Sequence, residues 1–151
     1  MRRNLIGVAL ALAFAGAAKA SDFIVVSSTD PGVKRGQALD GGAHVAVAPG
    51  KTLTIMRLSG EITTLAAGPS GVTLPVVRAS VSDPARFDNL KALIEPPPQG
   101  RTFGARRGGD ICPPAASLVS LDDILRVAEV AGCKTEARQA LDAYIAKGGA
   151  H

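Results

Sequence analysis

The chain has one internal histidine, and a histidine beside a carboxylate is a common arrangement for a general base. His44 follows Asp40 by four residues, and Asp40 begins a predicted Asp-Gly-Gly turn. We interpret His44 as a half-exposed strand residue that alternates with Val45, because a general base needs a nucleophile or an orienting carboxylate nearby and Asp40 lies in a turn. The sequence also has neither a G-x-S-x-G elbow nor a P-loop. No catalytic residue is assigned, and an enzyme or small-ligand site that uses His44 and Asp40 is kept as an alternative.

Three arginines form a second group with binding chemistry. Arg101, Arg106 and Arg107 lie within a segment rich in proline and glycine. Guanidinium groups bind carboxylates and phosphates, so this group is a candidate contact for an acidic partner, a lipid headgroup or an anionic glycan. The alternative is a solvated connector whose charges have no specific partner.

Two adjacent carboxylates, Asp122 and Asp123, do not form an acid–base pair, because neighbouring helical residues point in different directions. We predict that they place favourable negative charge at the N-terminus of a helix.

The only two cysteines are Cys112 and Cys133. In an oxidising compartment, they predict one disulfide that stabilises the fold by about 3 kcal/mol in the chain-entropy model. A redox-active pair is the alternative, but the spacing differs from Cys-x-x-Cys. The sequence shows no set of zinc ligands at a recognisable spacing, so we assign no metal and no cofactor.

The N-terminus has the three-part pattern of a secretory signal. Arg2 and Arg3 precede an uncharged apolar run over 5–18, and Ala18-Lys19-Ala20 matches a signal-peptidase site. We predict cleavage between Ala20 and Ser21. The apolar run is too short to span a bilayer comfortably, so no transmembrane anchor is expected after cleavage. The predicted location is the periplasm.

Removal of this leader also removes most of the net positive charge. The 17 basic residues include Arg2, Arg3 and Lys19, so 14 basic and 13 acidic residues remain. Nucleic-acid binding is therefore disfavoured, because it needs a concentrated positive surface. Aromatic residues make up 3% of the chain, which disfavours a stacking platform for sugars or bases.

Residues 21–80 are predicted to form a small antiparallel β sandwich or barrel. Short apolar runs are separated by glycine or proline turns about every ten residues. In the run 52–57, Leu53 and Ile55 alternate with polar residues, and we expect a two-residue Ser59-Gly60 loop to connect it to a strand over 61–65. A last strand is expected over 72–77, at a sheet edge because of Pro75.

The C-terminal half is predicted to be helical. Asp83 and Pro84 begin a helix within 81–95, and 96–111 is a Pro/Gly/Arg-rich loop. In 112–151, Ser120 and Asp123 form a candidate capping box, with Gly132 as the expected end of that helix. A second helix is expected to start at Thr135 and to end at Gly148-Gly149, and we expect the disulfide to staple the pair.

The stretch from Val33 to Leu74 resembles the periplasmic FecR-like β domain. Its pattern is a glycine-led turn over 33–42, a short strand and turn over 45–50, and a hairpin over 53–65 with glycine at the tip. The resemblance implies a role in carrying envelope signals through protein–protein contacts, with no catalytic residues. Unlike in members of that family, we expect no cytoplasmic segment and no persistent membrane helix in this chain, and its cysteine-bearing part lies outside the resemblance.

The sequence therefore predicts an α+β fold in which a β domain is followed by a helix and a disulfide-stapled helical pair. We expect an exported, non-enzymatic protein that binds another envelope protein through a sheet edge or through the apolar stripe of the last helix. The sequence does not indicate an oligomeric state.

Overall fold

The computed structural model describes residues 21–78, 83–96, 112–130 and 132–149. It contains a four-stranded antiparallel sheet in the order β2-β1-β4-β5 and a two-stranded sheet of β3 and β6. The strands are β1 (Phe23–Ser28), β2 (Ala38–Leu39), β3 (His44–Val45), β4 (Thr52–Arg57), β5 (Ile62–Ala66) and β6 (Val72–Thr73). Three α-helices complete the α+β fold that the sequence predicts: α1 (Pro84–Ile94), α2 (Leu121–Glu129) and α3 (Lys134–Ala146), with a 3₁₀ turn η1 (Ala115–Ser117) before α2.

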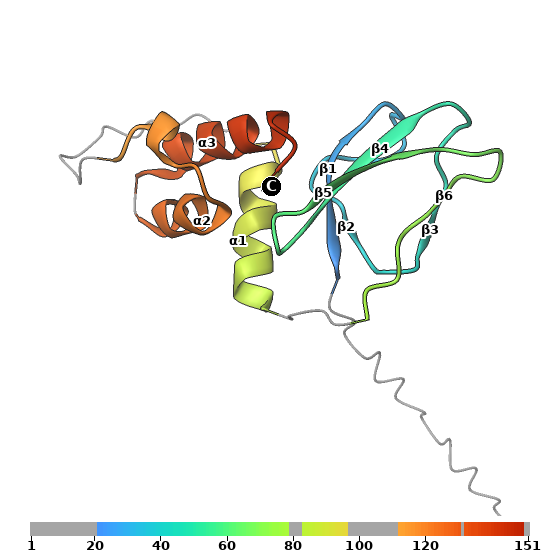
Figure 1. The fold of residues 1–151 in the computed structure, drawn as a ribbon, viewed down its shortest axis with the longest axis horizontal. Helices are drawn as coiled ribbons and strands as arrows, with labels where there is room; N and C mark the ends of the chain where they lie inside the picture. The colour runs from blue at the N-terminus through green and yellow to red at the C-terminus, as the bar shows by residue number, and fades with distance from the viewer. Residues whose placement is uncertain (1–20, 79–82, 97–111, 131, 150–151) are drawn as a thin grey trace, which may run out of the picture.

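The four-stranded sheet lies between two apolar cores. On one face, Ile24, Val26 and Met56 pack against the helices. On the other face, Phe23 and Val25 pack against residues from β3, β6 and the adjoining loops. Figure 1 shows this layering, with the helices and the two-stranded sheet on opposite sides of the larger sheet. The helical pair thus gains its stability by covering one face of the sheet, since two short amphipathic helices are not stable alone.

Two predicted β features differ in the structure. The β4–β5 loop has three residues, because the Arg57 N–H donates to the Glu61 carbonyl and the Gly60 N–H donates to the Arg57 carbonyl. This is the hairpin in which a glycine with positive φ follows a turn, and Gly60 has φ of 89°. The last strand ends at Thr73, before Pro75, so Val76 is exposed rather than part of a strand.

The helix ends follow local sequence signals. The Asp83 side chain accepts the Arg86 N–H at 3.0 Å and caps α1. Ser120 caps α2 by accepting the Asp123 N–H at 3.1 Å, and its hydroxyl donates to the Asp123 carboxylate at 2.7 Å. Ser120 is therefore the N-cap of α2, but the predicted capping box is only half formed, because the Asp123 carboxylate bonds the Ser120 hydroxyl and not the Ser120 backbone N–H.

The predicted boundaries between α2 and α3 are shifted. Gly132 has a φ of 95°, but α2 has already ended at Glu129 with Val130 as its C-cap. α3 begins at Lys134 with Cys133 as its N-cap, so Thr135 lies inside the helix. The physical reason is a turn between the helices: the Cys133 N–H donates to the Val130 carbonyl at 3.1 Å, and Gly132, with its positive φ, lies inside this turn and not at the end of α2.

Glycines close the last helix as predicted. The Gly148 N–H donates to the Ile145 carbonyl at 2.9 Å, and the Gly149 N–H donates to the Tyr144 carbonyl at 3.1 Å. This pair of bonds, with positive φ at both glycines, is a Schellman motif. It directs the chain after α3 back toward the sheet, where Gly149 forms an antiparallel bridge with Glu61.

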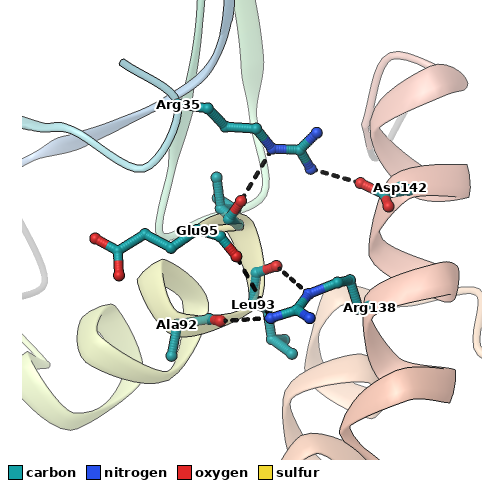
Figure 2. Close-up of polar contacts among 7 residues, drawn as sticks. Arg35, Ala92, Leu93, Glu95, Arg138 and Asp142 are labelled. Atoms are coloured by element: carbon teal, nitrogen blue, oxygen red, sulfur yellow. Dashed lines mark hydrogen bonds and ion pairs between the residues drawn. The ribbon is translucent and has the colours of Figure 1, made fainter. Parts of the chain in front are cut away.

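Two arginines hold the C-terminal end of α1 between the sheet and α3 (Figure 2). Arg138 of α3 donates to three backbone carbonyls of α1 and its C-cap: Leu93 at 3.0 Å, Ala92 at 3.1 Å and Glu95 at 3.4 Å. These carbonyls have no partners within the helix, so a cation here both satisfies them and interacts favourably with the helix dipole.

Arg35, from the loop before β2, completes this junction. Its Nε donates to the Ile94 carbonyl at 3.0 Å, and its guanidinium forms an ion pair with Asp142 of α3. One side chain from the β part therefore contacts both α1 and α3 (Figure 2).

In the described part of the chain, no helix is long and apolar enough to cross a membrane.

Candidate binding surfaces

The structure does not bring His44 and Asp40 together as an acid–base pair. His44 Nε2 lies 2.6 Å from the Ser70 carbonyl, and Nδ1 lies 3.2 Å from the Thr73 hydroxyl. Because a carbonyl can only accept, Nε2 is the donor in that contact. The Asp40 carboxylate instead accepts the Ser21 hydroxyl at 3.1 Å. His44 is therefore an exposed strand residue, as we interpret it from the sequence. Its side chain also forms a hydrogen bond with the 68–71 turn.

The disulfide between Cys112 and Cys133 is confirmed. It joins the segment before η1 to the residue that caps α3, and Cys133 is buried. The disulfide therefore links the segment that precedes η1 and α2 to the turn between α2 and α3.

Other predicted site residues fall into two groups. Arg101, Arg106 and Arg107 lie outside the described residues, and so does Ala20 on one side of the predicted cleavage site. Asp122 and Asp123 are described, and both lie in the first turn of α2. Asp122 forms an ion pair with Arg86 of α1, while the Asp123 carboxylate accepts the Ser120 hydroxyl.

One of the two predicted contact surfaces is not available. The apolar stripe of α3 packs into the core that the helices share with the sheet. Its buried members are Ala137, Ala140, Leu141 and Tyr144. Of the two predicted contact surfaces, the sheet edge is the one that stays accessible, and β5 provides it.

The outer edge of β5 carries backbone groups that point away from the sheet. β5 is the last strand of its sheet and pairs with β4 without interruption. The Arg57 N–H bonds to Glu61, and the Ala67 N–H bonds to Lys51. Because hydrogen-bonded pairs alternate along an antiparallel ladder, the N–H and C=O groups of Thr64 and Ala66 face outward. In the described ranges, no strand lies beyond them.

This edge lacks the features that usually prevent strand addition. Ile62–Ala66 contains no proline, no charged residue and no bulge relative to β4. The opposite edge, β2, has only two residues. Long, uncharged edges are templates for pairing with another chain, whereas short edges are protected. Gly149 already lies beside Glu61, so the open part of β5 begins after Ile62.

The two faces that flank this open edge differ in chemistry. On the face that carries the helices, the hydroxyl groups of Thr54 and Thr64 lie 3.1 Å apart and exposed. On the other face, Leu65 is partly buried against the second core. An added strand would therefore meet a polar surface on one side and an apolar surface on the other.

A second surface is a cleft of about 460 Å³ between the helices and the β4–β5 loop. Alanines of η1 and α3 leave space in its walls, and Tyr144 lies among its lining residues. The charged residues that line it are Arg86, Asp122 and Lys147. Sequence reasoning missed this cleft because its residues come from four separate elements, and no local spacing signals their convergence.

The described residues contain no group of three or more His, Cys, Asp or Glu side chains that could hold a metal ion. In comparisons with known proteins, no family model, no curated protein and no solved structure matches this chain. The β5 edge and the cleft are therefore the two surfaces whose geometry indicates a function.

Proposed function

We propose that this chain is an exported protein of the bacterial cell envelope that binds another envelope protein and has no catalytic role. The proposed docking surface is the outer edge of β5, where an extended segment of the partner adds a strand to the sheet. The leader pattern over 1–20 supports export, and a disulfide is compatible with an oxidising compartment.

The observation that carries the proposal is the outward backbone of Thr64 and Ala66 in an uncharged, unprotected strand. In strand addition, main-chain hydrogen bonds supply affinity and alternate side chains supply specificity. The partner segment should alternate small polar residues beside the Thr64 hydroxyl with apolar residues beside Leu65.

The FecR-like resemblance of residues 33–74 is part of the same proposal. The open edge lies wholly inside that stretch, and the family works through protein–protein contacts. Neither the resemblance nor the edge requires a catalytic group, and His44 and Asp40 bind different neighbours.

Photocrosslinking in intact cells tests the proposal. A photoreactive amino acid replaces Thr64 on the edge or, as the matched control, Thr135, an exposed threonine on α3. We expect a covalent adduct with a second envelope protein from position 64 and none from position 135. No adduct from position 64, or the same adduct from both positions, would contradict the proposal.

Proline substitution makes the test specific to the backbone. Thr64→Pro removes an N–H that faces away from β4, so the ladder within the sheet is kept. Thr63→Pro removes an N–H that β4 uses, so that variant should lose stability. We expect Thr64→Pro to abolish capture of the partner by the purified protein while the melting temperature changes little.

A further inference from the structure

The cleft between the helices and the β4–β5 loop has the features of a preformed ligand site. Two hydrogen bonds position its walls: Ser120 caps α2 by accepting the Asp123 N–H, and the Tyr144 hydroxyl donates to the Gly60 carbonyl. Its volume of about 460 Å³ is within the usual range for small-ligand pockets, which is about 300–1,000 Å³. The hollow is therefore already present in the protein without a ligand.

The apolar part of the cleft is open to solvent. Val119 lies on its rim with 73% of its surface exposed, which is unusual for a large apolar side chain in this protein. Ala116 and Ala143 are also exposed and line the same space. Apolar surface at the mouth of a hollow favours a ligand with an apolar body.

The charged part of the cleft has one positive charge in excess. Arg86 forms an ion pair with Asp122, so the two charges offset each other. Lys147, at the C-cap of α3, also lines the cleft. Among the described residues, no carboxylate lies within ion-pairing distance of Lys147. A ligand with a single negative charge would complement this arrangement.

The part of the cleft that α3 lines offers few polar partners to a peptide. Ala140, Ala143 and Tyr144 lie within α3, where backbone N–H groups are hydrogen-bonded within the helix, and the Gly149 N–H is engaged in the Schellman motif. Leu121 and Asp122 lie in the first turn of α2, where backbone N–H groups have no partner within the helix. Along α3, a peptide would bury amide groups without partners, whereas an alkyl chain carries no polar group that needs one.

We propose that this cleft binds a small amphiphile with an alkyl body and one carboxylate, whose head pairs with Lys147 and whose chain covers Val119 and the alanines. This site is separate from the open part of β5, so it stands or falls independently of the proposed docking function.

The protein supplies its own optical probe for the test. Tyr144 is the only tyrosine in the chain, there is no tryptophan, and Tyr144 lines the cleft. Decanoate titrated into the folded mature protein should produce a saturable change in tyrosine fluorescence. Decanol, which lacks the charge, should bind about fivefold more weakly, and decyltrimethylammonium more weakly still.

Two kinds of variant distinguish recognition of the ligand's carboxylate from recognition of its alkyl chain. Lys147→Gln should weaken decanoate about fivefold, while Lys134→Gln, at the other end of α3, should leave it unchanged. Ala143→Leu should weaken decanoate and decanol alike by filling the cleft. The proposal is overturned if decanoate gives no saturable change, if decyltrimethylammonium binds as well as decanoate, or if Lys147→Gln binds like the wild type.

Discussion

The Tyr144 hydroxyl donates a hydrogen bond of 3.2 Å to the Gly60 carbonyl. This buried contact joins residues 84 positions apart and fixes the last helix on the β4–β5 loop. The same loop precedes β5 and lines part of the cleft with Ser59. The contact therefore positions one wall of the cleft and the start of the open edge. The two candidate binding surfaces therefore adjoin the same junction between the helices and the sheet, although each can be tested separately.

Gly60 should tolerate a side chain less well than Gly50. Both residues have positive φ, 89° and 77°, so alanine strains the backbone at each position. At Gly60 the added Cβ would also lie 2.5 Å from the Tyr144 hydroxyl, whereas at Gly50 it would meet open space. We expect Gly50→Ala to cost about 1 kcal/mol and Gly60→Ala about 2–4 kcal/mol in urea unfolding. Equal losses would show that the Tyr144 contact does not constrain the loop.

Arg138 should contribute more stability than an exposed arginine. Arg138→Gln removes donors to three carbonyls at the end of α1, and we expect a loss of about 1–2 kcal/mol in the free energy of unfolding. Arg126→Gln is the matched control, because Arg126 is exposed and makes only a 3.7 Å ion pair with Asp123. Its loss should be below about 0.5 kcal/mol. Indistinguishable variants would refute the role of Arg138 as a helix clamp.

The disulfide should stabilise the fold through the length of the loop that it closes. Cys112 and Cys133 are 21 positions apart, which corresponds to about 3 kcal/mol in the chain-entropy model. Cys112→Ala/Cys133→Ala should lose about that amount in denaturant unfolding. Dithiothreitol should destabilise the wild type and leave the double variant unchanged, and a wild type unaffected by complete reduction would contradict this expectation.

Asp30 should make stability depend on pH in the acid range. The backbone N–H groups of Ala48 and Gly32 donate to its carboxylate at 2.7 and 2.8 Å, and they lower the pKa of Asp30 below its ordinary value of 3.8. A lowered folded-state pKa stabilises the fold above pH 3.8, and that contribution is lost as the pH falls through the folded-state pKa. The advantage of the wild type over Asp30→Asn should therefore shrink on acidification. An advantage that stays constant or grows, measured by urea unfolding at several pH values, would be the opposite result.

Local signals in the sequence predicted much of the fold. The alternation of Leu53 and Ile55 placed β4 correctly, with both side chains buried in one core. The N-cap at Ser120 and the glycines after α3 defined helix ends because their hydrogen bonds join residues only a few positions apart. The disulfide followed from the small number of cysteines.

The features that sequence analysis missed depend on contacts between distant residues. Both faces of β1 are apolar, so its sequence could not show that Ile24 faces the helices and Phe23 faces the smaller sheet. The burial of the α3 stripe, which removed one predicted contact surface, depends on the same docking. The carbonyl partners of Arg138 lie more than 40 positions away, and no periodic pattern predicts such a contact.

Amide hydrogen exchange of the purified protein tests the open edge of β5 most directly. If no strand covers it, the N–H groups of Thr64 and Ala66 exchange rapidly, while those of Thr63 and Leu65, which face β4, exchange slowly. Addition of the captured partner should then slow exchange at Thr64 and Ala66 alone. Equal protection along the whole strand in the isolated protein would contradict the account, because the proposed docking surface would already be occupied.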